Sequence, residues 1–571
     1  MSHTGFIHAD SGLVAKVWFT VMQRLALTTV LGVVMMANRE CPAAEETQSH
    51  GASSQDIEET GRLVRAARTL REKYHADPHR PTYHFVAPEG VCFPFDPQGC
   101  IFWKGKYHLF YAVQLDVGPR IQPVGELGAW GHASSVDLVH WIHHPVPLVA
   151  TPEDPERQVY AGGSLINKDG VPTMIYHGVD SGTCIATAED DDLIHWKKHP
   201  NNPVIRLPKK GDPNYGTYHV WDTCGWMKDG VYYSISGDKP NTPPKTNGDI
   251  AFLFRSYDMA NWEYLHPFYK SDRRWTPEDE DCSCPDFFPL GDKHVLMFIS
   301  HTQGTQYYIG RYEEDKFYPE RHGKMNWAGG PVFAQDSLVD DKGRRIFWAW
   351  ACESRVREAQ LAAGWSGIMT LPRVLSLADD GTMLIEPAEE LAMLRRNPRT
   401  QEYLVLGSDS EQTLEIARGD CLELSLEVDV QQTRQFGLKV RCSPDGVEQT
   451  VITFDPAAKT LSIDTTKSSL SKDIIQPWPH PQAAFHRNAI RDSKDVRVQT
   501  APFELAAGER LELRVFLDRS IIEVYANGRQ CVTQRIYPTR SDSQGIVLFS
   551  KGGNTIVQSC KAWDMAPANG I

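Results

Sequence analysis

Short apolar strands separated by polar turns recur along the middle of the chain. Residues 101–103 and 107–111 flank a Lys104-Gly105 turn, a pattern typical of a β-hairpin, and Asp96 with a Pro-Gln-Gly turn precedes it. Four further hairpins of the same order follow at intervals of roughly 50 to 65 residues, beginning near Gly162, Asp222, Asp286 and Asp336. Five repeats of antiparallel strands predict an all-β fold that begins with a five-bladed β-propeller, one repeat to each blade.

A second repeated pattern supports this interpretation. An aspartate stands four residues before a tryptophan at three places, which end in Trp141, Trp196 and Trp262. Each would close the outer part of a blade. We expect these tryptophans to pack between neighbouring blades as core residues and not to bind ligand.

Carboxylates recur at nearly equivalent positions of the repeats. The first strand of each propeller blade lines the central channel, so Asp96, Asp222, Asp286 and Asp336 would converge there, while the second blade has glycine. Like charges brought together raise at least one pKa, which supplies an acid and a base at neutral pH. This pattern indicates glycoside hydrolysis first and divalent metal binding second.

The pattern changes after the repeats. Residues 397–399, Asn-Pro-Arg, are interpreted as a linker, and from Tyr403 onward alternating strands with Gly, Asp and Asn turns predict a β-sandwich. The expected domains are a propeller over 81–394 and a sandwich over 400–566.

The N-terminus has the pattern of a targeting segment. A charged start at residues 22–24, an apolar run over 25–37 and small residues up to Ala44 predict a secretory signal over 1–44. The alternative is a short N-terminal anchor. A leader over 45–80 would start polar and then form a short helix within 57–74, where apolar residues recur with a helical period. We therefore expect a secreted or periplasmic protein that is not stably inserted in a membrane.

Composition narrows the function. The net charge of -14 argues against a nucleic-acid partner and suits a protein acting on neutral substrates. Neither a phosphate-binding loop nor a dinucleotide fingerprint is found, so no cofactor is expected. Of the twelve cysteines, Cys282 and Cys284 have poor zinc spacing, so buried thiols are favoured over a metal site.

Ordered motifs over about 81–563 give a more specific indication: they resemble glycoside hydrolase family 32, the β-fructosidases. The motifs are Phe95-Asp96-Pro97-Gln98-Gly99, Trp130-Gly131-His132-Ala133, Cys284-Pro285-Asp286-Phe287-Phe288, Leu371-Pro372-Arg373, Leu517-Asp518-Arg519-Ser520 and Glu523-Val524-Tyr525. The resemblance implies a retaining glycosidase that cleaves β-fructofuranosidic bonds in sucrose or fructans.

The resemblance also implies site residues. Asp96 would be the nucleophile, and Asp222 would hold sugar hydroxyls and stabilise the transition state. The residues expected to contact the carbohydrate substrate are Gln98, Gln114, Trp130, Trp221 and Asp286. Trp221 stands where the family has arginine, so part of the usual hydroxyl clamp is absent.

The main departure concerns the acid/base. The family's glutamate precedes Cys-Pro-Asp, whereas this chain has Ser283, which cannot protonate a leaving group at neutral pH. Asp281 shares a strand face with position 283, and Glu280 would reach it if the strand were bulged. Both are candidates for the acid, with Asp281 preferred. In the alternative interpretation the acidic run is a solvated loop and activity has been lost.

Three functional hypotheses follow. The first is a secreted retaining β-fructosidase with a displaced acid/base. The second is a propeller glycosidase for another furanoside or pyranoside, and the third is a non-catalytic carbohydrate-binding protein. Release of reducing sugar separates the first two hypotheses from the third, and a substrate panel separates the first from the second.

Overall fold

The chain forms two compact units, one of 1–78 with 115–127 and 571, the other of 79–114 with 128–570. The computed structural model describes residues 54–91, 95–116, 126–238, 249–278, 280–430, 432–479, 490 and 493–568. In the first unit helix α2 (Ser54–Ala76) includes the helix predicted within 57–74. The predicted signal over 1–44 lies outside the described residues. None of the helices in the described ranges is long and apolar enough to cross a membrane.

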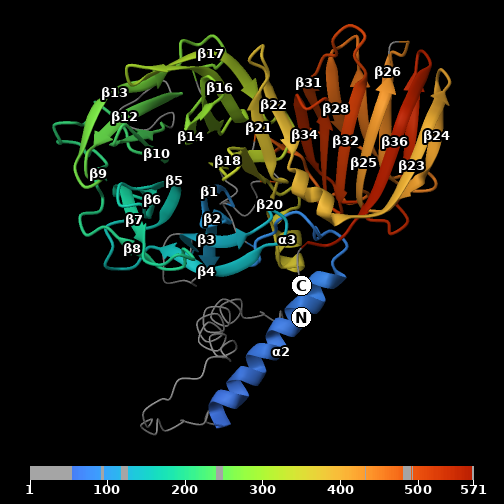
Figure 1. The fold of residues 1–571 in the computed structure, drawn as a ribbon. Coiled ribbons are helices and arrows are strands. Elements are labelled where there is room, and N and C mark those ends of the chain that lie inside the picture. Colours follow the sequence, from blue (N-terminus) through green and yellow to red (C-terminus); the bar gives the residue numbers. More distant parts are fainter. Residues whose placement is uncertain are drawn as a thin grey trace, which may run out of the picture. The chain divides into compact units, whose positions relative to one another are not determined.

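The second unit begins with five antiparallel sheets, numbered here as blades I to V (Figure 1). Blade I contains β1 (Pro97–Trp103), β2 (Lys106–Asp116), β3 (Glu126–Ser135) and β4 (Ile142–Val149). Blade II contains β5 (Val159–Ile166), β6 (Pro172–Gly178), β7 (Gly182–Ala188), β8 (Trp196–Lys198) and β9 (Ile205–Arg206). Blade III contains β10 (Thr223–Lys228), β11 (Val231–Ser236), β12 (Ile250–Ser256) and β13 (Trp262–Lys270). Blade IV contains β14 (Ser283–Leu290), β15 (Lys293–Ser300), β16 (Gly304–Glu313) and β17 (Lys316–Lys324). Blade V contains β18 (Val332–Val339), β19 (Arg345–Ala351), β20 (Ile368–Met369), β21 (Arg373–Leu377) and β22 (Met383–Pro387), with the short helix α3 (Arg357–Ala363) between β19 and β20.

The first strands of the blades form a ring. β1 contacts β5, β5 contacts β10, β10 contacts β14, β14 contacts β18, and β18 returns to β1. Blade V is joined to blade I by a hydrogen bond in which the backbone N–H of Cys100 donates to Asp336 Oδ2 over 2.7 Å. The predicted five-bladed propeller is confirmed.

Four of the five inner strands contain a register shift. The shifts lie between Gln98 and Ile101, Val159 and Gly162, Ser283 and Asp286, and Phe333 and Gln335. In β1 the irregularity depends on Gly99, which has φ +60° and whose Cβ, if present, would lie 2.7 Å from the ring of Trp130. A bulge bends its strand and redirects side chains, so these shifts determine which groups face the axis.

The repeated Asp-to-Trp pattern forms turns between the third and fourth strands of blades I to III. Leu138, Leu193 and Met259 are buried in these turns and adopt left-handed backbone conformations with φ of 64°, 56° and 62°. Trp141 lies 6.1 Å from Trp348 of blade V, measured between ring centroids. The other two tryptophans likewise pack against the preceding blade: Trp196 against Phe110 and Trp262 against the cluster that includes Leu165. These tryptophans therefore contact the neighbouring blade as expected, but each is only partly buried, and Trp262 also lines a cavity.

The β-sandwich follows a short 3-10 helix, η2 (Glu389–Leu394), and consists of two six-stranded sheets. The first sheet has the order β23 (Arg395–Leu406), β36 (Thr555–Met565), β25 (Cys421–Asp429), β32 (Leu511–Asp518), β33 (Ile521–Ala526), β34 (Gln530–Arg535). The second has the order β24 (Ser410–Arg418), β35 (Gly545–Lys551), β26 (Gln435–Cys442), β27 (Thr450–Asp455), β28 (Thr460–Asp464), β31 (Val498–Pro502). A small ribbon pairs β29 (Pro477–Trp478) with β30 (Lys494–Asp495).

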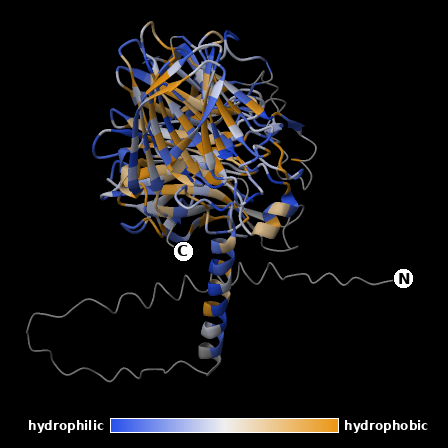
Figure 2. Ribbon diagram, turned by 90° about the vertical axis from the view of Figure 1, so that its right-hand side faces the viewer, coloured by the Kyte–Doolittle hydropathy of each residue, from blue (hydrophilic) through white to orange (hydrophobic). Residues whose placement is uncertain are grey.

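Hydrophobic and hydrophilic residues alternate along the sandwich strands (Figure 2), because one face of each sheet packs against the other sheet. The linker expected at 397–399 is instead part of β23, which pairs with β36 and shifts register between Arg396 and Arg399. The chain therefore enters the sandwich directly from η2.

Buried ion pairs join the propeller to the sandwich. Arg373 at the start of β21 lies 3.1 Å from Glu523 of β33, and both side chains are fully buried. Glu523 also accepts hydrogen bonds from the backbone N–H of Leu371 and from the hydroxyl of Tyr525. Burial alone would raise the pKa of Glu523, but the charge of Arg373 and hydrogen bonds from His84 and Tyr525 hold it at about 2. The carboxylate is thus ionised at neutral pH and compensates a buried guanidinium.

Replacing Glu523 by alanine should destabilise the protein strongly, because Arg373 would remain charged, buried and unpaired. A loss on the order of 3–5 kcal/mol is expected for breaking such a buried pair. Glu427→Ala is the matched control, because Glu427 pairs with Arg510 on the same sandwich but its side chain is 41% exposed. That control should cost about 0–1 kcal/mol. Urea unfolding of the three proteins measures the difference, and equal losses for both variants would contradict the role given to Glu523.

Candidate active site

Two carboxylates stand together just before the inner strands of blades I and III. Asp96 precedes β1, and its backbone carbonyl accepts a hydrogen bond of 2.8 Å from Ala112 of β2. Asp222 precedes β10, and its carbonyl accepts one of 2.8 Å from Gly237. Asp96 is only 9% exposed and Asp222 only 6%. Oδ1 of Asp96 has no hydrogen-bond partner among the described residues. The hairpins thus fix both backbones and leave one buried carboxyl oxygen of Asp96 unpaired.

The surroundings separate the pKa values of the two carboxyls. Burial raises the pKa of Asp96 to about 7, the negative charge of Asp222 adds to this rise, and His301 opposes it. Burial acts on Asp222 in the same direction, but His177 at 3.5 Å and hydrogen bonds from Cys284 hold its pKa below the usual range. Two neighbouring carboxyls with separated pKa values are typical of hydrolytic sites.

The bulge in β14 supplies the donor to Asp222. Cys284 lies at this register shift with φ +44°, which is unusual for a residue with a side chain. Its backbone N–H donates to Asp222 Oδ2 over 3.1 Å, and its Sγ lies 3.5 Å from the same oxygen. The sequence interpretation placed Cys284 in a family motif and expected a buried thiol, but it missed this contact, because strand alternation does not reveal a bulge.

Asp281, the preferred acid in the sequence interpretation, accepts three hydrogen bonds. The Ser283 hydroxyl donates to Oδ2 over 2.8 Å, the His301 backbone N–H donates to Oδ1 over 2.7 Å, and His301 Nδ1 lies 2.5 Å from Oδ2. Both Asp281 and Ser283 are buried, whereas the His301 side chain is 16% exposed. His301 was not identified from the sequence.

Glu280, the other candidate acid, has different neighbours. Its Oε2 accepts a hydrogen bond of 3.0 Å from Gln306 Nε2, and Ser300 and Lys324 also interact with it. Burial raises its pKa to about 7. Asp96 is influenced by Asp222 and His301, and Glu280 is not among the groups that shift its pKa. Within the acidic run, Glu278 is exposed, whereas Glu280 and Asp281 are buried with different hydrogen-bond partners, although the charge of Asp281 adds to the raised pKa of Glu280.

Asp286 and Asp336 form a second pair, distinct from Asp96 and Asp222. Asp286 Oδ2 accepts a 2.5 Å hydrogen bond from the Ser337 hydroxyl, and Arg345 is its charged neighbour. Burial raises the pKa of Asp286 to about 6, and burial together with the charge of Asp286 raises that of Asp336 well above the usual range. Asp286 and Asp336 lie within their strands, whereas Asp96 and Asp222 lie just before theirs, so the four aspartates expected at the central channel form two pairs.

The residues predicted to contact sugar occupy different environments. Gln98 is buried in β1, and its Oε1 lacks a hydrogen-bond partner in the described part of the chain. Trp221 is half-buried with its ring 4.9 Å from that of His177, and Gln114 is half-buried in β2. Trp130, by contrast, is completely buried and donates its indole N–H to the carbonyl of Tyr160. This corrects the expectation for Trp130, which belongs to the blade core and not to a sugar-binding surface.

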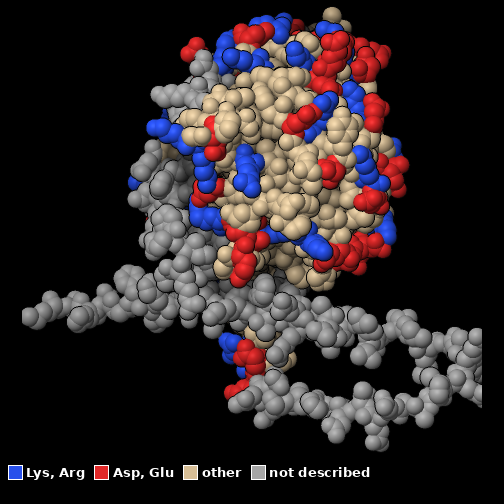
Figure 3. All heavy atoms as spheres, turned by 90° about the vertical axis from the view of Figure 1, so that its left-hand side faces the viewer, with Lys and Arg blue, Asp and Glu red and all other residues tan. Residues whose placement is uncertain are grey.

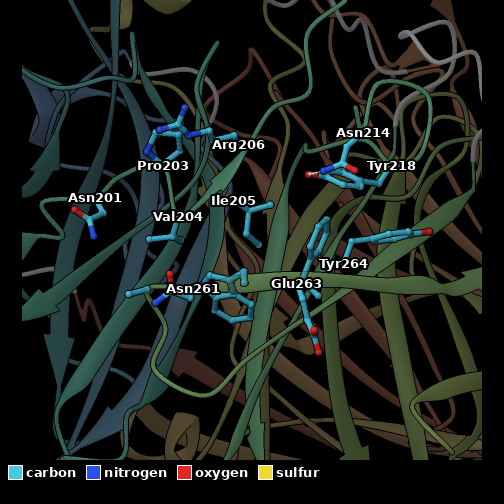
Figure 4. A pocket seen from close by; sticks show the side chains of 13 residues that line it. Asn201, Pro203, Val204, Ile205, Arg206, Asn214, Tyr218, Asn261, Glu263 and Tyr264 are labelled. Atoms are coloured by element: carbon cyan, nitrogen blue, oxygen red, sulfur yellow. Dashed lines mark hydrogen bonds between the residues drawn. The ribbon is translucent and has the colours of Figure 1, made fainter. Parts of the chain in front are cut away.

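A separate cavity of about 680 Å³ opens between the outer parts of blades II and III (Figure 4). Its walls include Tyr218, Tyr264, Asn214, Asn261 and Glu263. None of the four axial aspartates lines it. Around this side of the propeller, where β9 and β13 lie in Figure 1, acidic and basic residues are interspersed around uncharged surface (Figure 3).

Metal-binding groups are not assembled in the described ranges, where no cluster of three or more His, Cys, Asp or Glu could hold an ion. The ten cysteines in these ranges are free thiols, and most of them are buried.

Known proteins with similar sequences and structures span most of the chain. A sucrose-6-phosphate hydrolase of Zymomonas mobilis is 27% identical over 508 residues, covering 83% of this chain and 90% of that protein. A fructan 1-exohydrolase of Leymus chinensis is 27% identical over 569 residues, covering 86% and 88%. The crystal structure of fructan 1-exohydrolase IIa from Cichorium intybus superposes with a TM-score of 0.73 at 24% identity, covering 86% of this chain and 98% of that one, and shows the shared fold.

The family models agree with the two-part architecture. The N-terminal domain of glycosyl hydrolases family 32 matches residues 84–387, and the C-terminal domain of the same family matches residues 390–564. These ranges correspond to the propeller and the sandwich. The chain belongs to glycoside hydrolase family 32.

Proposed function

We propose that this protein is a retaining β-fructofuranosidase that hydrolyses the β-fructofuranosidic bonds of sucrose or of fructans. The family and its fructosidase relatives make the chain a glycosidase of this type. The single observation that carries the proposed site is the burial of Asp96, with one unpaired carboxyl oxygen, beside the ionised Asp222. Such an arrangement suits a nucleophile, because the unpaired oxygen is left to react with the anomeric carbon of a bound substrate.

In this mechanism Asp96 attacks the anomeric carbon and forms a covalent fructosyl ester, which water then hydrolyses. Asp222 remains a carboxylate because Cys284 and His177 stabilise its charge, and it would accept hydrogen bonds from sugar hydroxyls. Gln98 lies two residues after Asp96, and Trp221 directly precedes Asp222. Both are proposed substrate contacts, together with Gln114. Asp286 interacts with Asp336 and Arg345, so we propose that it supports the floor of the site.

The domain boundaries and the location of the protein are further parts of the proposal. We propose a propeller over 81–394, a sandwich that begins with β23 at Arg395 and extends to about 566, and export directed by residues 1–44. The N-terminal charge and apolar pattern supports export. A plant relative, the insoluble β-fructofuranosidase isoenzyme CWINV3 of Arabidopsis thaliana, is 26% identical over 572 residues.

Asp96→Asn should abolish hydrolysis while the fold survives. The amide cannot attack the anomeric carbon, so turnover of sucrose, inulin or levan should fall by about 10⁴-fold or more. Asp292→Asn is the matched control, because Asp292 is exposed in the turn between β14 and β15. The control should retain parental activity in an assay for released fructose. A parent protein that binds these sugars but releases none would instead support a binding protein, and release from arabinofuranosides alone would indicate another glycosidase.

The pH dependence of kcat/KM should report the raised pKa of Asp96. A raised pKa favours the neutral carboxyl, and attack requires the carboxylate, so kcat/KM should fall as the pH drops through about 7. Asp222→Asn removes the negative charge that contributes to this rise. The acidic limb of the variant's weaker activity should therefore move to lower pH. An unchanged limb in Asp222→Asn would contradict the electrostatic coupling between the two carboxyls.

A further inference from the structure

We propose that His301, oriented by Asp281, is the general acid/base of this site and replaces the carboxyl that is missing at Ser283. This inference rests on the proposed function and names the group that transfers the proton. It changes the role of Asp281 from proton donor to positioning residue.

The register of the β14–β15 hairpin brings these groups together. Near the turn Asp286 pairs with Met297, but beyond the bulge Ser283 pairs with Ile299, so the register has shifted by one residue. Asp281 lies just before β14, and His301 lies just after β15, in the turn that leads to β16. The two residues therefore extend from the paired ends of the same two strands, and their hydrogen bonds show that they meet there.

The hydrogen bonds fix the imidazole in one orientation. Asp281 holds His301 twice, through the backbone N–H at 2.7 Å and through Nδ1 at 2.5 Å. Ser283 donates its hydroxyl to the same carboxylate over 2.8 Å, so the residue at the family's acid position supports the Asp281–His301 pair. With Nδ1 engaged, Nε2 is the ring nitrogen left for a substrate. A carboxylate that orients an imidazole through one nitrogen and leaves the other for proton transfer is a recurrent catalytic arrangement.

The position of His301 suits proton transfer at the axis. Its charge acts on Asp96, whose pKa it lowers, so the two groups are electrostatic neighbours. Its ring lies 5.6 Å from that of Phe333 on β18, and 16% of its side chain is exposed while Asp281 is buried. Among the other candidates for the acid, Asp281 already accepts three hydrogen bonds, Glu280 contacts Gln306 and Lys324, and Ser283 has no acidic proton at neutral pH.

The reaction balances with water as the only co-substrate. In the first step the Asp96 carboxylate forms a bond to the anomeric carbon, the glycosidic C–O bond breaks, and protonated His301 gives its Nε2 proton to the leaving oxygen. In the second step neutral His301 accepts a proton from water as that water attacks the anomeric carbon. The ester bond to Asp96 then breaks, and both the carboxylate and the imidazolium are restored.

His301→Gln tests the proposal through its dependence on the leaving group. Sucrose needs protonation of its leaving oxygen, so its kcat/KM should fall by about 10²–10⁴-fold. An aryl β-fructofuranoside with a nitrophenolate leaving group does not need it, so formation of the fructosyl enzyme should stay within a few-fold of the parent. Hydrolysis of that intermediate lacks its base, so a burst of nitrophenol should appear. Azide, which attacks without a base, should restore turnover and give fructosyl azide.

Two further variants distinguish a loss of proton transfer from a loss of folded structure. His195→Gln removes an exposed histidine that contacts Asp190 through Nδ1 over 2.8 Å, and it should behave like the parent on both substrates. Asp281→Asn should reduce sucrose hydrolysis more than release of nitrophenol, a difference that general loss of structure would not produce. Circular dichroism and the thermal midpoint of each variant verify folding.

Parental sucrose hydrolysis by folded His301→Gln would overturn the proposal. So would a leaving-group dependence that appears in Glu280→Gln and not in His301→Gln. Asp96→Asn separates the test of the proposed function from the test of His301. If Asp96→Asn is inactive on both substrates while His301→Gln is fully active, the proposed function stands and only the role of His301 fails. Activity of Asp96→Asn on either substrate would instead refute the proposed function.

Discussion

The hydrogen bond from the backbone N–H of Cys100 to Asp336 is the contact on which the geometry of the axis depends. A bulge in β1 removes Cys100 from the regular ladder, and a buried N–H without a partner is costly, on the order of 1–3 kcal/mol. Asp336 of blade V satisfies it and thereby joins the last blade to the first. Because Asp96 lies only four residues before Cys100, the contact that closes the ring also positions the proposed nucleophile.

The axial acids therefore divide into two groups with different consequences. Asp286 and Asp336 are buried within their strands and are compensated by Ser337, Arg345 and the Cys100 N–H. Asp96 keeps an oxygen without a hydrogen bond, which is unfavourable for folding and is tolerated because the surrounding hairpins fix its backbone. A buried carboxyl oxygen without a hydrogen-bond partner, next to a second carboxylate, is an arrangement that occurs at ligand-binding and catalytic sites.

The sequence could predict those features that depend on local periodicity. Five hairpins, the three turns ending in tryptophan and the sandwich strands all follow from alternation and turn residues. The bulges could not be predicted, because Gly99 reveals one of them but nothing in Ser283-Cys284-Pro285 states that two residues there oppose one. The hydrogen bonds between Asp281 and His301 join residues that are far apart in the sequence and lie outside the regular strands, so alternation does not reveal them.

Exchange of a carboxyl for an imidazole at the acid position has an electrostatic logic. A carboxylic acid placed beside Asp96 and Asp222 must remain protonated until it gives its proton to the leaving group. Its deprotonated form would add a third negative charge to a desolvated site. A positively charged imidazolium in the same place would instead oppose the rise in the pKa of Asp96 and so favour the carboxylate form that attack requires. Ser283 fits this arrangement because its neutral hydroxyl donates a hydrogen bond to Asp281 and adds no further negative charge to the site.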